Sequence, residues 1–403
     1  MYSSDTVTRE KSKSALFSGA VPFSKKQNKI LNIFFYAVLG GTFLSMLGII
    51  LYYVYAYASL HSGAHSFDWL LGIFSDFVEI MNISLEESPY LVEDSSYPPL
   101  AIAVLYPFAL ICKGVLAKYA NTDMSVDELT SQVILHPQFW VAMVLFFVVC
   151  SAVIIFAVIL AYKLPPVQSI KVGIIILTSA PFVYAVMRGN TIYFALIFLL
   201  LFLLLYKNEN AFVREIGYIC LVLAGLIKIY PLFFGVFLLC EKRIWASVRI
   251  ALYTVGFFFL SFFLLDGGIN NFEPFVQNLG GFASNTVRLG AGNNLSATSL
   301  VYKLLGVFSD NPSYSETLNI VSLAVVALVF LFSTALAIYT RCEFSRFVIA
   351  SATVILLPSV SYFYVLIFML LPFMEFIRNY DELDAKTKRL YTVLFFIVFL
   401  TPI

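Results

Sequence analysis

The 403-residue sequence predicts an all-α polytopic membrane protein. Hydrophobic residues make up 61% of it and charged residues only 12%, whereas an average soluble domain carries about 25% charged residues. A helix that crosses a bilayer needs about 20 consecutive apolar residues, and runs of this length recur from Asn32 to the end of the chain. The net charge of +1 gives no basic field that would attract nucleic acid, so no nucleic-acid partner is expected.

The first element is a basic tail followed by a long apolar segment. Residues 1–28 contain five Lys or Arg residues and predict a cytoplasmic tail, whereas residues 31–60 carry no charge and predict the first span. Basic residues precede this span and acidic ones follow it, so the positive-inside rule orients it from the cytoplasm outwards. Residues 29–403 are expected to form a single transmembrane domain.

The segment 59–97 is then the first large non-cytoplasmic loop. It holds seven carboxylates and neither Lys nor Arg. Apolar residues recur at helical spacing over residues 67–82, which predicts an amphipathic helix that lies at the membrane interface rather than crossing it. That helix would carry Asp76 and Glu79 on one face, near the lipid headgroups.

Asp76 is the carboxylate of this loop that differs from the others. Most of the seven must simply solvate the loop, and that interpretation stays open for Asp76. Phe74 and Phe77 lie on either side of it, however. A carboxylate held against an apolar surface has a raised tendency to take up a proton, which suits a general base.

No metal site and no cofactor are predicted. The five cysteines show no CxxC spacing. His61 and His65 stand four residues apart beside Asp68, which leaves a zinc site as the alternative.

After the first loop, hydrophobic segments and charged turns alternate. Tyr97-Pro98-Pro99 begins a second span, because proline is tolerated in the first helical turn, and this span is expected to return the chain to the cytoplasm near Ala117. Alternation gives about eleven crossings, within a range of about 10–12 spans, and puts a second large loop, 266–298, on the same side as the first. The other expected spans are 138–162, 169–187, 191–206, 216–240, 244–265, 317–340 and two that flank residues 358–362, whereas the last apolar run, 390–403, is short for a span.

Ionisable residues at membrane depth are costly and indicate function. Lys228 has apolar neighbours on both sides, and Pro231 breaks the helix beside it. Its ammonium needs an anionic partner, either a lipid phosphate or, alternatively, an internal carboxylate or the carbonyls that Pro231 frees. Arg188, in Arg-Gly-Asn, either serves the site or snorkels to the interface. Arg288 in the second loop is expected to reach the same aqueous face as Asp76.

Five short motifs occur in order between residues 68 and 375. They are SDFVEIMN with SYPPLAIAVLYPFA about twenty residues later, RGNTIYFALIFLLLFLLL, AGLIKIYPLFFGVFLL, GNNLSATSLVYKLL and LLPSVSYFYVLIFMLLP. Together they resemble glycosyltransferase family 87, which comprises polyprenyl-phosphate-sugar-dependent mannosyltransferases of the GT-C superfamily. The resemblance implies a GT-C-type helical bundle in the bacterial cell membrane, with its active site on the non-cytoplasmic side.

The resemblance also implies a reaction. A hexose, mannose in this family, would pass from a polyprenyl-phosphate donor to a hydroxyl of a glycan or glycolipid acceptor, with inversion and with Asp76 as general base. The departing phosphate needs positive charge, for which Lys228, Arg288 and Arg188 are candidates in that order. A monophosphate requires no divalent cation as a diphosphate does, and the chain has no Asp-x-Asp. The other residues expected to bind substrate lie in the matched motifs: Glu79, Tyr97, Asn190, Tyr230 and Asn293.

Two features do not fit this pattern directly. Many family members carry a His shortly after the late Ser-aromatic pair, where this chain has Tyr362, Phe363 and Tyr364. Alternation also puts Arg188 at the cytoplasmic end, away from Asp76, unless residues 169–206 form a re-entrant hairpin.

Two other classes of protein remain as alternatives. A transporter or a flippase of lipid-linked sugars would explain the spans and the intramembrane lysine, but it should show internal repeats, and none is evident. A polysaccharide polymerase or ligase typically uses several arginines in its outer loops, where this chain has only Arg288.

Overall fold

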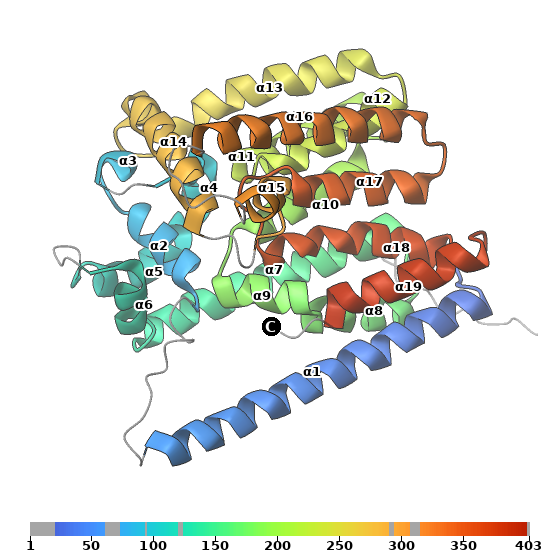
Figure 1. The fold of residues 1–403 in the computed structure, drawn as a ribbon, viewed down its shortest axis with the longest axis horizontal. Coiled ribbons are helices and arrows are strands. Elements are labelled where there is room, and N and C mark those ends of the chain that lie inside the picture. The colour runs from blue at the N-terminus through green and yellow to red at the C-terminus, as the bar shows by residue number, and fades with distance from the viewer. Residues whose placement is uncertain are drawn as a thin grey trace, which may run out of the picture.

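The computed structural model describes residues 21–60, 73–92, 95–119, 124–289, 294–306 and 315–400, and the side chains of all of these except 49–50, 52–60, 92, 281–289, 305–306 and 315–317. Helices are the only regular elements in this part of the chain, and most of them run side by side (Figure 1). In chain order they are α1 (Lys25–Leu60), α2 (Ser75–Ile83), α3 (Pro89–Val92), α4 (Pro99–Ala103), α5 (Tyr106–Leu116), α6 (Val126–Val133), α7 (Pro137–Tyr162), α8 (Pro166–Thr178), α9 (Ala180–Arg188), α10 (Ile192–Leu205), α11 (Ala211–Ile227), the 3₁₀ helix η3 (Tyr230–Gly235), α12 (Val236–Cys240), α13 (Ile244–Phe262), η4 (Gly268–Asn271), α14 (Phe272–Leu289), α15 (Ala297–Gly306), α16 (Ser315–Tyr339), α17 (Glu343–Leu356), η6 (Phe363–Met369), α18 (Leu370–Arg378) and α19 (Ala385–Leu400).

The helices confirm the predicted all-α polytopic membrane protein. Among the described residues, four helices are long and apolar enough to cross a membrane: α1, α7, α13 and α16. A fifth crossing results if α8 and α9, which meet at 52°, count as one bent span. Between 11% and 39% of each of the four apolar windows is buried inside the protein, so most of their apolar surface faces outwards, as lipid contact requires.

Contacts of α1 and α7 distinguish the two ends of the bundle. The Val21 N–H, just before α1, donates to the Lys163 carbonyl just after α7, at 3.1 Å. At the other end, the Phe74 ring, just before α2, packs against Phe139 and Trp140 in the first turn of α7, at 5.4 and 5.7 Å between centroids. We call these the opposite end and the α2 end. Helix α7 therefore starts at the α2 end and finishes where α1 begins.

Residues 97–117 differ from the predicted second span. They form two short helices, α4 and α5, and the 11 residues of α5 extend about 16 Å, roughly half of a bilayer core. The Phe108 ring of α5 packs against Phe77 of α2 and Phe146 of α7 at 6.0 and 5.7 Å. Both helices stay with α2, α3 and α6 at the α2 end (Figure 1). The chain does not return to the opposite end through this segment.

The direction of the following helices is therefore the reverse of what alternation predicts. Helix α8 begins at the opposite end, where the Gln168 side chain donates to Asn28 of α1 at 2.8 Å. Helix α9 ends at Arg188, in contact with α2. The bend between them falls at Ser179, which has an extended backbone, and the next turn contains Pro181, which lacks the N–H that would continue the helix. A hairpin is not needed to bring Arg188 to Asp76.

Two further helices break at the α2 end. Helix α11 stops at Ile227, Lys228 is extended, and η3 starts at Tyr230 with Pro231 in its first turn. Helix α17 likewise ends at Leu356, and η6 begins only at Phe363. Non-helical backbone at membrane depth is tolerated where it is buried in protein or lines a cavity. The second polar loop lies at the same end, since the Asn278 side chain of α14 donates to the Tyr90 carbonyl of α3 at 3.0 Å.

Candidate active site

A cavity of about 720 Å³ lies at the α2 end, where the broken helices converge. Six of the nine residues that the sequence predicts for the site line it: Asp76, Glu79, Tyr97, Arg188, Lys228 and Tyr230. Its volume is within the usual range for small-molecule sites, about 300–1,000 Å³.

Asp76 lies in the first turn of α2, with 4% of its surface exposed. The residue before that turn, Phe74, has a left-handed backbone, and its N–H donates to the Met187 carbonyl at the end of α9 at 2.5 Å. This contact brings the start of α2 onto Arg188, whose guanidinium forms an ion pair with Asp76 Oδ1. The charge of the buried carboxylate is thereby compensated.

The second carboxylate oxygen of Asp76 is also held. Asn190 Nδ2 donates to Oδ2 at 2.6 Å, and Asn190 Oδ1 accepts from the Ile192 N–H at 3.0 Å. Asn190 is 1% exposed and does not line the cavity, so it contacts Asp76 from behind rather than facing the space that a substrate would fill. The Arg-Gly-Asn motif thus fixes both oxygens of one carboxylate.

Helix α2 is more enclosed than the sequence indicates. It begins at Ser75, and seven of its nine residues are buried. The physical reason is that α4 and α5 remain beside it and cover the face that a helix on the membrane surface would turn to lipid. Asp76 is therefore enclosed by protein, where its carboxylate pairs with Arg188 and Asn190.

Gly189 permits the close approach of α9 to α2. Its φ is +64°, and a Cβ built there would lie 2.3 Å from Phe77 Cβ. We expect Gly189→Ala to lower the free energy of unfolding by about 2–5 kcal/mol, because the left-handed backbone costs about 1–2 kcal/mol and the overpacking about 1–3 kcal/mol. Thermal unfolding of the purified protein in detergent measures this effect. Gly40→Ala is the matched control, since a Cβ at Gly40 meets no atom within 4 Å, and equal unfolding temperatures for the two variants would contradict the prediction.

Lys228 contrasts with Arg188. Its Nζ lies 5.1 Å from the centroid of the Tyr97 ring, and in the described part of the chain it forms no ion pair with a carboxylate. The internal salt bridge that the sequence left open is thus not seen there. Burial, with the negative charges of Asp76 and Glu79, raises the pKa of Tyr97 well above its usual value. The Tyr97 hydroxyl therefore stays protonated and able to donate.

Tyrosines form much of the remaining polar surface. Tyr362 and Tyr364 line the cavity together with Tyr230 and Asp76. The Tyr184 ring stacks on Tyr364 with 6.3 Å between centroids. Sequence reasoning noted Tyr362 and Tyr364 only as the place of a missing His. The sequence feature that could have indicated these two tyrosines is the aromatic run directly after a helix break that contains proline.

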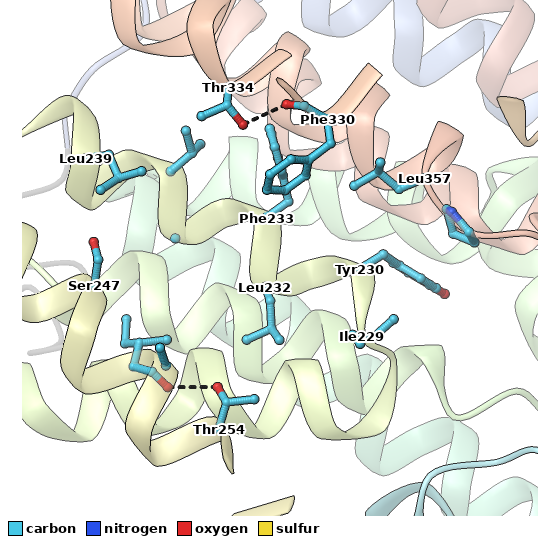
Figure 2. Close-up of a pocket in the computed structure, with 15 residues that line it drawn as sticks. Ile229, Tyr230, Leu232, Phe233, Leu239, Ser247, Thr254, Phe330, Thr334 and Leu357 are labelled. Carbon is cyan, nitrogen blue, oxygen red and sulfur yellow. Dashed lines mark hydrogen bonds between the residues drawn. The ribbon is translucent and has the colours of Figure 1, made fainter. Parts of the chain in front are cut away.

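An apolar groove adjoins the cavity, and Figure 2 shows the side chains that line it. It has a volume of about 580 Å³ and shares Ile229, Tyr230, Leu232, Thr254 and Pro358 with the cavity. The side chains that form it come from η3, α12, α13, α16 and the end of α17, and they are almost all hydrocarbon. The Thr254 and Thr334 hydroxyls donate to carbonyls of their own helices, at 2.8 and 2.7 Å (Figure 2), so they offer no free donor to a ligand.

Several predicted residues lie outside the described part of the chain. These are the side chain of Arg288 and the whole of Asn293, together with His61, His65 and Asp68 of the zinc alternative. Among the residues that are described, no three His, Cys, Asp or Glu side chains are grouped so that they could hold a metal ion.

The sequence model of glycosyltransferase family 87 matches residues 96–361. The matched range begins just before Tyr97 and ends within the break between α17 and η6, so it contains every cavity element except α2 and the residues after Ser361. No curated protein and no solved structure gives a significant match.

Proposed function

Because the chain belongs to glycosyltransferase family 87 and is therefore a membrane glycosyltransferase, we propose that it transfers a hexose from a polyprenyl-phosphate donor to a hydroxyl of a glycan or glycolipid acceptor. The hexose that we propose is mannose. The observation that carries this proposal is a polar cavity and an apolar groove that share five lining residues. A buried carboxylate held at both oxygens lines the cavity together with Lys228, which forms no ion pair with a carboxylate of the described residues, and the apolar groove adjoins it.

The groove fits the lipid part of such a donor. A polyprenyl chain is a long hydrocarbon with no hydrogen-bonding groups, and the groove offers an almost unbroken apolar lining. Because the chain enters the groove from the hydrocarbon of the membrane and not from water, its binding there rests on van der Waals packing against the lining. The phosphate would then lie at the junction of groove and cavity, near Lys228.

The charges around the cavity fit a single phosphate group. A sugar linked through one phosphate carries one negative charge, which Lys228 can balance. Arg188 is committed to Asp76, which supports a positioning role for it in place of the phosphate contact that the sequence suggested. Tyr97, whose ring contacts the lysine, and Tyr364, which lines the same cavity, supply hydroxyl donors.

The chemistry then follows from these positions. The acceptor hydroxyl loses its proton to Asp76 while its oxygen attacks the anomeric carbon from the face opposite the phosphate. A new glycosidic C–O bond forms, the bond between the anomeric carbon and the phosphate oxygen breaks, and polyprenyl monophosphate leaves. The configuration is inverted. Lys228 stabilises the charge that develops on the departing phosphate.

We place this reaction on the non-cytoplasmic side. Lys25, Lys26 and Lys29 lie at the start of α1, at the opposite end of the bundle from the cavity. Charged turns with Lys207, Arg243 and Arg378 also follow α10, α12 and α18. The positive-inside rule assigns such an end to the cytoplasm.

The direct test is transfer by purified protein from a panel of labelled polyprenyl-phosphate sugars. We expect transfer from the mannose donor with inversion at the anomeric carbon. If no donor supports transfer and the protein instead moves lipid-linked sugar across the membrane of proteoliposomes, it is a transporter and not an enzyme.

The groove makes a separate prediction about donor chain length. Thr254→Trp places an indole among the residues that groove and cavity share, so we expect KM for a long-chain donor to rise about tenfold or more, because overfilling such a space costs about 1–3 kcal/mol. A donor with only one or two isoprene units should be little affected. Leu252→Trp, on the exposed face of the same helix, is the matched control. Equal losses with long and short donors would contradict a role of the groove in binding the tail.

A further inference from the structure

Asn294 joins the second polar loop to the floor of the cavity. Its side chain is 4% exposed. Nδ2 donates to the Ser359 carbonyl at 2.9 Å, while Oδ1 accepts from the Ser361 N–H at 2.9 Å and from the Ser296 N–H at 3.0 Å. One amide group therefore satisfies backbone groups on two segments that are 65 residues apart.

The next two residues add to this contact. The Leu295 N–H donates to the Ser361 carbonyl at 2.7 Å, and the Ser296 hydroxyl donates to the Ser359 carbonyl at 2.9 Å. The same hydroxyl accepts from the Ser299 N–H at 3.0 Å, at the start of α15. Four hydrogen bonds thus cross between residues 294–296 and 359–361, and we call this set of contacts the clasp.

The clasp meets a specific need of residues 358–362. They form the break between α17 and η6, so the helical ladder does not satisfy their N–H and C=O groups. Such groups are costly to bury without partners. Tyr362 is the last residue of the break and Tyr364 lies in the first turn of η6, and both line the cavity. The direction in which these phenols enter the cavity depends on how the break is held.

We propose that Asn294 and Ser296 are positioning residues for the transfer reaction, which act by holding Tyr362 and Tyr364 against the substrate space. The proposal rests on the proposed function, since it assigns those tyrosines to substrate binding. The clasp also makes the geometry of the site depend on the second polar loop, to which residues 294–296 belong. Neither residue touches the cavity itself.

The test is a double-mutant cycle of Asn294→Ala with Tyr364→Phe, read as kcat/KM for transfer. A misplacement of about 1 Å costs about a hundredfold in rate, and we expect a loss of that order for Asn294→Ala. In the double variant the two losses should be far less than multiplicative, because both act on the same hydroxyl. Losses that multiply, or an unchanged kcat/KM for Asn294→Ala, would overturn the proposal.

Matched variants separate positioning from folding. Ser361→Ala removes a buried hydroxyl that, in the described part of the chain, has no hydrogen-bond partner, and it leaves the clasp intact, so kcat/KM should not change. Ser296→Ala removes a single bond across the clasp and serves if Asn294→Ala does not fold. For Ser296→Ala we expect a smaller loss of kcat/KM, which again does not multiply with the loss caused by Tyr364→Phe. An unchanged kcat/KM for Ser296→Ala would contradict the clasp.

A readout without activity keeps the clasp distinct from the reaction. With 3-fluorotyrosine incorporated at position 364, the ¹⁹F resonance should shift or broaden in Asn294→Ala and stay in place in Ser361→Ala. An unchanged resonance in both would overturn the positioning role. If the wild-type protein transfers no sugar but the resonance still shifts in Asn294→Ala, the proposed function is overturned and the clasp stands.

Discussion

Asp76→Asn is expected to abolish sugar transfer, with kcat lowered by about 10²–10⁴, the usual contribution of a general base. The amide has nearly the shape of the carboxylate but cannot take the proton of the acceptor hydroxyl. The oxygen of the introduced amide can still accept the hydrogen bond from Asn190 Nδ2 once the amide has rotated. The measurement is single-turnover transfer from labelled donor, alongside equilibrium binding of the same donor.

The control for this variant is stability, because Asp76 is also half of a buried ion pair. Removing one partner of such a pair costs about 3–5 kcal/mol, so the unfolding temperature must be compared with the assay temperature. Glu87→Gln is the matched variant, because this exposed carboxylate does not line the cavity, and it should retain full activity. Donor binding that persists without transfer supports the base, whereas full activity of Asp76→Asn removes it from that role.

The sequence predicted Asp76 and Arg188 separately, but not their contact. The error lies in residues 97–117, whose hydropathy is that of a span. Hydropathy reports the environment of side chains and not the path of the backbone, so two short helices enclosed by protein give the same signal as one crossing. Pro107, at the start of α5, was the local sign of a break. This misplaced crossing reverses the expected direction of α7 to α11, which is why Arg188 was expected at the wrong end. The break at Lys228 then divides the expected span 216–240 in two, so α13 again ends at the predicted side, where Phe262 packs on Tyr90.

Local features of the site were more predictable than its long-range contacts. The break at Lys228 follows from Pro231, because proline cannot continue the preceding helix, and the structure places it there. The clasp is different, since Asn294 meets Ser359 only after 65 residues of intervening chain. The sequence motif suggested the neighbouring Asn293 instead. A short polar motif marks a loop, but which of its amides meets buried backbone depends on packing that the motif does not contain.

Lys228→Ala is expected to weaken donor capture, with kcat/KM for the donor lowered by about 10- to 100-fold. A charge-assisted hydrogen bond contributes about 1.5–3 kcal/mol, and the cavity has no second uncommitted cation among its described lining residues. Binding of a labelled polyprenyl-phosphate sugar measures the effect directly. Lys228→Arg keeps the charge and should recover part of the affinity. Lys113→Ala, an exposed cation on α5 at the same end, should change nothing.

The contact of Lys228 with the Tyr97 ring requires one more comparison. If the lysine served only to hold that ring, its loss would act through Tyr97 rather than through the phosphate. Lys228→Met keeps much of the alkyl packing on the ring without the charge, so the two roles separate in this variant. We expect Lys228→Met to bind donor as weakly as Lys228→Ala, and a competing polyprenyl monophosphate to lose affinity in parallel. Donor binding by Lys228→Met at the wild-type level would show that the ammonium does not hold the phosphate.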